Sequence, residues 1–161
     1  NWTISSGGRL GFIASWGSVP VNGSFGSWSG KVRFSPDVLD KTDIRIAVDL
    51  GSVNTKDSQR DSQLKGADFF NVGAHPQAVF TANSARDLGN GRYSAPGTLS
   101  LHGVSRPVTV NFTLKINGDR ATVSGTTRLD RTSFGVGSGE YAGTDQIGGN
   151  VAVNFGFTAT R

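Results

Sequence analysis

The chain has 161 residues, of which 35% are hydrophobic and 17% are charged. This length fits one domain spanning residues 1–161, and the even spread of apolar residues excludes a membrane-spanning chain and argues against disorder. The net charge of +4 comes from lysines and arginines scattered without a basic run, so we expect no nucleic-acid partner.

Residue usage favours a mostly β structure. Good helix formers are scarce, with Glu140 as the single glutamate, whereas glycine and β-branched residues are abundant. Because cysteine is absent and only two histidines occur, we expect neither disulfides nor a transition-metal site. A chain that starts at Asn1 and holds no methionine is expected to be a mature protein or a module of a longer exported one.

The N-terminal third alternates between apolar and polar residues with a period of two. Even positions from Trp2 to Trp16 are largely apolar, and Gly7-Gly8 between them predicts a kink or bulge in one long strand. Two further strands are predicted over residues 28–34 and 43–50, where apolar residues alternate with charged ones.

Residues 55–70 contain the only plausible helix of the sequence, predicted over about residues 57–70. Asp57 or Thr55 would be its N-cap, and Gly66 would stop it. Phe69 and Phe70 follow this stop and are expected to close one end of the structure.

The second half returns to the period of two. Asn90-Gly91 and Asn117-Gly118 predict type I′ hairpin turns. About eight antiparallel strands result, each with one apolar face, and such a sheet must close into a barrel or fold as a sandwich. Alternation alone does not choose between the two. The predicted strands of this half cover residues 78–82, 93–101, 108–116, 121–129 and 151–159.

Motifs of covalent catalysis are missing, so no enzymatic activity is expected. In Gly26-Ser27-Trp28-Ser29-Gly30 a tryptophan occupies the place of the nucleophilic serine. His102 precedes Gly103 at a strand end and is interpreted as a loop histidine. The glycine-rich segment 135–139 lacks the Lys-Ser/Thr ending of a phosphate loop.

One set of motifs is more specific. The segment Ser52-Val-Asn-Thr55, Arg60-Asp61-x-x-Leu64, Asp68-Phe69-Phe70, His75-Pro76-x-Ala-x-Phe80 resembles the YceI-like, polyisoprenoid-binding family. Matches extend across the chain, from Trp2 and Ile4 through Pro20 to Pro36 and Gly97 to Val108, and on to Leu129-Asp-Arg131-x-x-Phe134-Gly135-Val-Gly. The resemblance implies an eight-stranded antiparallel lipocalin-like barrel with one short helical segment.

The resemblance also implies a function. A long polyisoprenoid or similar amphiphilic lipid, such as a prenyl quinone or a polyprenyl phosphate, would lie inside the barrel for storage, transport or presentation. No cofactor would be required beyond the bound lipid or quinone, which would itself support any electron transfer. Such proteins are usually exported in bacteria, so we expect a periplasmic or extracellular location, transient membrane contact and other modules of the same polypeptide as partners.

Candidate ligand-binding residues are the inward apolar positions of the predicted strands, together with an arginine beside the glycine-rich loop at residues 135–149. The alternative is a secreted carbohydrate-binding β-module, which the three tryptophans would also suit. Arg60-Asp61 is interpreted as a structural ion pair or cap. The candidates are Phe12, Trp16, Trp28, Phe34, Ile46, Val48, Phe80, Leu99, Phe112, Arg131, Phe155 and Phe157.

Overall fold

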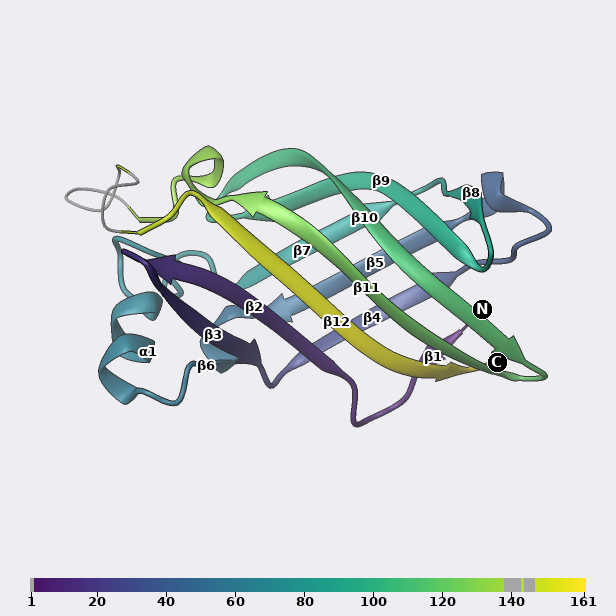
Figure 1. The fold of residues 1–161 in the computed structure, drawn as a ribbon, viewed down its shortest axis with the longest axis horizontal. Coiled ribbons are helices and arrows are strands. Elements are labelled where there is room, and N and C mark those ends of the chain that lie inside the picture. Colours follow the sequence, from purple (N-terminus) through teal and green to yellow (C-terminus); the bar gives the residue numbers. More distant parts are fainter. Residues whose placement is uncertain (1, 138–142, 144–146) are drawn as a thin grey trace.

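A computed structural model describes residues 2–137, 143 and 147–161, and shows a long antiparallel barrel with a helix at one end (Figure 1). Its helical elements are α1 (Ser58–Lys65) and the short 3-10 turns η1 (Leu39–Lys41), η2 (Leu50–Ser52) and η3 (Arg131–Phe134). The strands are β1 (Thr3–Ile4), β2 (Arg9–Trp16), β3 (Val19–Phe25), β4 (Trp28–Arg33), β5 (Asp43–Asp49), β6 (Val53–Asn54), β7 (Gln77–Ala82), β8 (Arg86–Gly89), β9 (Arg92–Leu101), β10 (Val104–Asn117), β11 (Arg120–Asp130) and β12 (Asn150–Thr160).

The twelve strands belong to one sheet, ordered β4-β5-β7-β9-β10-β11-β12-β2-β3-β6, with β1 beside β12 and β8 beside β9. A hydrogen bond from Trp2 N to Val32 O (2.8 Å) also joins β1 to β4. The sheet therefore closes on itself at the end where both chain termini lie (Figure 1).

The predicted fold class is confirmed, and the difference in strand number has a physical cause. The first predicted strand is split into β1 and β2 at the expected glycines, with Gly7 at a φ of +90°. β3 lies before the strand predicted over residues 28–34 and is separated from β4 by Gly26-Ser27, and the short β6 and β8 were not predicted either. One split strand and three strands that were not predicted convert the eight expected strands into the twelve of the described residues.

One of the two predicted hairpin turns is confirmed, and the other is displaced by one residue. Asn90 and Gly91 both have positive φ, 57° and 76°, as a type I′ turn requires. Asn117 instead pairs with Arg120 inside the ladder, so the loop is Gly118-Asp119. Of these two only Gly118 has a positive φ, +62°, which fits the type II′ turn with glycine at its first central position.

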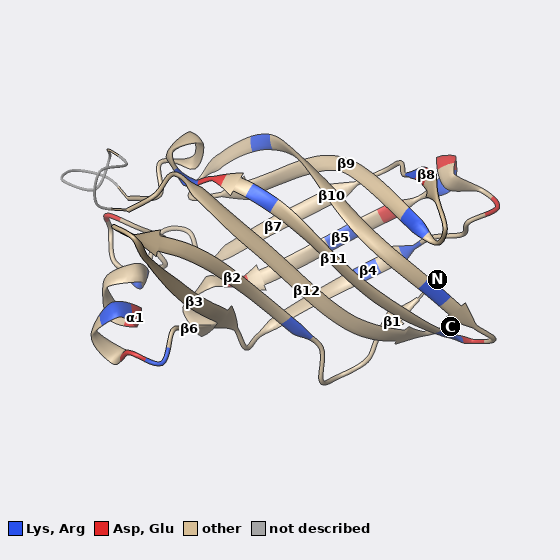
Figure 2. Cartoon of the chain, in the orientation of Figure 1, with Lys and Arg blue, Asp and Glu red and all other residues tan. Residues whose placement is uncertain are grey.

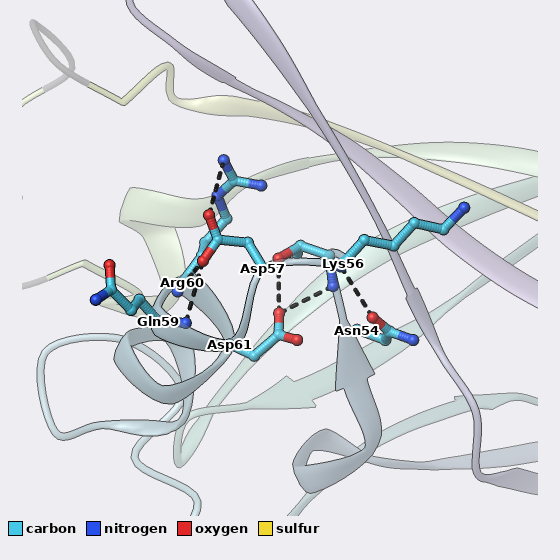
Figure 3. A network of polar contacts seen from close by, with 7 residues as sticks. Asn54, Lys56, Asp57, Gln59, Arg60 and Asp61 are labelled. Atoms are coloured by element: carbon cyan, nitrogen blue, oxygen red, sulfur yellow. Dashed lines mark hydrogen bonds and ion pairs between the residues drawn. The ribbon is translucent and has the colours of Figure 1, made fainter.

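The predicted helical segment is shorter than expected. α1 spans Ser58–Lys65, and residues 67–70 form a turn instead of a continued helix. The Asp57 side chain accepts hydrogen bonds from the backbone N–H groups of Gln59 and Arg60, both at 3.1 Å (Figure 3). None of the α1 residues is buried, so its ends must contribute much of its stability.

Asp57→Ala should loosen α1 specifically. Loss of an N-cap carboxylate costs about 1 kcal/mol, so the amides of Gln59 and Arg60 should exchange with deuterium about fivefold faster. Hydrogen exchange followed by mass spectrometry measures this, with Ser62→Ala in the same helix as the control. Equal protection in wild type and Asp57→Ala would show that the cap does not hold the helix.

Candidate functional site

The barrel encloses a cavity of about 330 Å³. Side chains from the long strands, from η2, from α1 and the turn after it, and from the segment after η3 line it, and nearly all of them are apolar. This volume lies at the lower end of the roughly 300–1,000 Å³ typical of ligand pockets. The interior is therefore not filled by the protein's own side chains.

All twelve residues proposed from the sequence line this cavity: Phe12, Trp16, Trp28, Phe34, Ile46, Val48, Phe80, Leu99, Phe112, Arg131, Phe155 and Phe157. They come from seven strands and η3, with Phe34 directly after β4, and the closed sheet brings them to one space. Their contact with a ligand stays a prediction.

Several lining residues were not predicted from the sequence. Arg60, Gln63 and Leu64 reach the cavity from α1, and Val136 and Ile147 reach it from the segment after η3. The apolar Leu64 in an otherwise polar helix is the one sequence signal that could have placed α1 over the cavity.

At the terminal end of the barrel the cavity meets a packed aromatic group. The Trp2 indole donates to Phe34 O at 3.0 Å, and the Phe34 ring makes edge contacts with Tyr93 and Phe112 at centroid distances of 5.3 and 5.7 Å. The Arg161 guanidinium lies over the Trp2 ring at 4.6 Å. Burial raises the pKa of Tyr93, and the negative charges of Asp87 and Asp37 raise it further by smaller amounts.

The opposite end of the cavity lies beside α1 and holds the exposed residues of its lining. Trp16, the last residue of β2, is 45% exposed, and Gln63 on α1 is also exposed. The polar lining residues are Ser15, Arg60, Gln63, Thr127 and Arg131; each lies on α1, on η3 or near the α1 end of its strand (Figure 1).

Arg131 holds the chain segment that follows η3. It donates from Nε to Gly148 O (3.0 Å), from Nη1 to Val136 O (2.8 Å), and from Nη2 to Gly143 O (2.7 Å) and Ile147 O (2.8 Å). Arg131 is only 5% exposed. Burial lowers the pKa of its guanidinium, and the negative charge of Asp130 opposes this shift. Arg131 thus organises the cavity end, and its predicted contact with a head group is not tested by these bonds.

The neighbouring carboxylate fixes the start of η3. Asp130 accepts hydrogen bonds from the Thr132 N–H (3.0 Å), from the Thr132 hydroxyl (2.6 Å) and from the Ser133 hydroxyl (3.2 Å). The Thr132 hydroxyl is the main cause of a lowered pKa for Asp130. The glycine-rich loop was predicted as part of the mouth, and its residues 138–142 and 144–146 lie outside the described residues.

Arg60 and Asp61 do not form an ion pair with each other. This corrects the interpretation of the motif as an ion pair of these two residues and supports its interpretation as a cap. Asp61 accepts from the Thr55 N–H (2.9 Å) and from the Thr55 hydroxyl (2.6 Å), fastening the segment before α1 to the helix (Figure 3). Arg60 Nη2 instead lies 3.9 Å from Asp57 Oδ2, with both side chains about half exposed.

His102 is confirmed as a loop residue. It has a φ of 57° in the His102-Gly103 turn between β9 and β10. Its Nδ1 lies 3.2 Å from Phe134 O, and since a carbonyl only accepts, this nitrogen carries the proton. The His75 ring contacts the His102 ring at 5.4 Å between centroids. Within the described ranges, no three His, Asp or Glu side chains gather as a metal site would require.

The described residues also contain no helix that is long and apolar enough to cross a membrane.

Comparison with known proteins gives consistent similarities. The family profile of the YceI-like domain matches residues 2–159. A UPF0312 protein of Vibrio parahaemolyticus is 30% identical over 130 residues, which cover 75% of this chain and 69% of that protein. The crystal structure of Burkholderia cenocepacia BcnA superposes with a TM-score of 0.93 at 27% identity, over 98% of this chain and 99% of that one.

A second solved structure shares the fold at lower identity. A polyisoprenoid binding domain from Saccharophagus degradans, implicated in plant cell wall breakdown, superposes with a TM-score of 0.75 at 18% identity. The alignment covers 99% of this chain and 97% of that domain.

Proposed function

The chain belongs to the YceI-like domain family, and on this premise we propose that it binds a long polyisoprenoid or similar amphiphilic lipid inside its barrel. The observation that carries the proposal is the apolar cavity of about 330 Å³ that runs from the aromatic group at the termini to α1. The Saccharophagus degradans neighbour, a polyisoprenoid binding domain of the same fold, supports the ligand class.

Burial of an isoprenoid chain provides the driving force. Each isoprene unit carries five carbons, so at about 0.8 kcal/mol per methylene-sized group its transfer from water is worth about 3–4 kcal/mol. The net affinity is much smaller, because ordering the chain costs entropy and because the competing state of the lipid is a membrane. Exchange with a bilayer is then feasible, which suits storage, transport or presentation.

The finer parts of the proposal concern the head group and the cellular setting. We propose a prenyl quinone or a polyprenyl phosphate as ligand, an exported protein in the periplasm or outside the cell, and transient contact with a membrane. The protein would perform no covalent chemistry, and electron transfer would proceed only through a bound quinone.

The alternative of a carbohydrate-binding module has less support. Sugar platforms present exposed aromatic faces, whereas Trp2 is 6% exposed and Trp28 packs edge-on against Phe157 at 5.7 Å. All three tryptophans, including the half-exposed Trp16, line the apolar cavity. This placement suits a lipid chain.

Extraction of the purified protein with organic solvent tests the proposal. Mass spectrometry of the extract should find a prenyl lipid near one per chain, and its mass separates a quinone from a polyprenyl phosphate. Protein unfolded in guanidinium chloride and refolded without lipid is the control and should give no such species. A lipid-free preparation that also fails to take up added geranylgeraniol in native mass spectrometry would overturn the proposal.

A further inference from the structure

We infer that the cavity has a direction: a lipid with a single head group enters tail first between the β2–β3 turn and α1, and Arg60 on α1 contacts its head. This inference rests on the proposed function and adds to it the portal, the orientation of the ligand and a residue that favours an anionic head group.

The portal follows from exposure. Among the described residues that line the cavity, only Trp16 and Gln63 are exposed, and they lie at the end of β2, beside the β2–β3 turn, and on α1. α1 covers this end of the barrel (Figure 1), and it contributes no buried residue, although Leu64 packs against the core. Phe69, Phe70 and Ile147 are buried in a cluster at this end of the barrel, so a chain that enters here passes along the exposed edge of that cluster, beside Trp16 and Gln63.

The other end of the cavity is sealed. Its lining residues Trp2, Phe34, Ala121 and Ala159 are 2–6% exposed. The indole hydrogen bond to Phe34 O and the Trp2–Val32 bridge fasten this end. A charged head group could not leave solvent here without a large desolvation cost, because no polar side chain of the lining faces it.

The polar lining residues are all on the portal side, and Arg131 and Thr127 bond to the backbone of the protein. Arg131 donates to backbone carbonyls, and the Thr127 hydroxyl donates to Thr109 O at 2.9 Å. Arg60 differs, because its recorded ion pair with Asp57 is long, at 3.9 Å, and both side chains are about half exposed. Such a pair contributes little and leaves the guanidinium able to bind a carboxylate or phosphate.

Figure 2 shows that α1 carries charges of both signs. Asp57 and Asp61 are used by the N-cap and by Thr55. Of the two cationic residues on the helix, Arg60 lines the cavity, whereas Lys65 is exposed and lies outside the lining. Lys65 is therefore a matched control for Arg60.

Two isomers of bromohexadecanoic acid test the orientation, because bromine quenches tryptophan emission on contact. One isomer carries bromine on the terminal carbon and the other on the carbon next to the carboxyl group. Trp16→Phe removes the portal tryptophan and leaves Trp2 and Trp28, which line the inner part of the cavity.

The terminal isomer should quench the emission of Trp16→Phe strongly. The isomer with bromine next to the carboxyl group should leave the emission of Trp16→Phe unquenched. In wild type it should quench only the emission of Trp16. The reverse pattern, equal quenching by both isomers, or no quenching by either would each overturn the inference of tail-first entry.

Arg60→Gln tests head-group recognition. This variant should weaken hexadecanoate binding about three- to fivefold, on the scale of a partly exposed ion pair, and leave hexadecanol binding unchanged. Lys65→Gln should change neither. Equal affinities of wild type and Arg60→Gln for hexadecanoate would remove Arg60 from the head-group site.

The two proposals fail in different ways. If wild type takes up geranylgeraniol and the brominated acids do not show the expected pattern, the proposed function stands and the inferred direction is wrong. If neither prenol nor fatty acid enters the barrel, both are wrong.

Discussion

Replacing Val110 and Val123 together by tryptophan should reduce the affinity for geranylgeraniol by several hundredfold. Both valines line the cavity from the adjacent strands β10 and β11, and both are only half-buried because they face its empty space. If the indoles displace about four or five methylene-sized groups of ligand, the loss is about 3–4 kcal/mol, which corresponds to that change in Kd.

The same strands provide the matched control. Thr109 and Thr122 precede these valines by one residue, are exposed and point outward, because side chains alternate along a strand. Thr109→Trp with Thr122→Trp should bind the prenol within about twofold of wild type by fluorescence titration. Circular dichroism checks that both variants fold. Unchanged affinity in a folded Val110→Trp, Val123→Trp protein would place the ligand elsewhere.

Arg131→Met should lower the free energy of unfolding by at least about 3 kcal/mol. The substitution leaves the carbonyls of Val136, Gly143, Ile147 and Gly148 without the guanidinium that binds them. The bonds to Val136 and Ile147 are buried, and a buried polar group without a partner costs about 1–3 kcal/mol. For a chain of this size the midpoint of thermal unfolding should fall by roughly 6–12 °C.

Arg128→Met is the control for this prediction, since Arg128 lies three residues earlier on β11 and is exposed. It should shift the midpoint by no more than about 2 °C. Arg131→Lys should remain close to Arg131→Met, because a single ammonium cannot reproduce the fork of guanidinium donors. A thermal midpoint for Arg131→Met equal to that of wild type would show that the loop carbonyls find other partners.

The cavity lining could be predicted because a strand encodes its faces directly. Phe12, Ile46 and Phe155 alternate with outward residues in a period of two, so one apolar face was assigned without any knowledge of the sheet order. The volume could not be predicted in the same way. Eight strands enclose either a packed core or a ligand, and the difference depends on how Phe34, Tyr93 and Phe112 stack at one end.

Features that depend on tertiary placement were missed. The composition of α1 predicts an exposed helix, but nothing in the sequence places Arg60 and Gln63 at the opening of the barrel. The turn after β10 differs by one residue, because the pairing of Asn117 with Arg120 outweighs the local preference of Asn-Gly for a type I′ turn. The bonds of Arg131 to four carbonyls were also not predicted, because they depend on the path of an irregular loop, and its contact with a head group stays a prediction.

Nuclear Overhauser contacts between ¹³C-labelled geranylgeraniol and the protein test the central claim most directly. The account predicts contacts from the prenyl methyl groups to the methyl groups of Ile46, Leu99 and Val110, which line the cavity. It predicts none to the methyl groups of the outward-facing Thr109 and Thr122. Contacts confined to these outward threonines, with the inward methyl resonances unshifted, would contradict it.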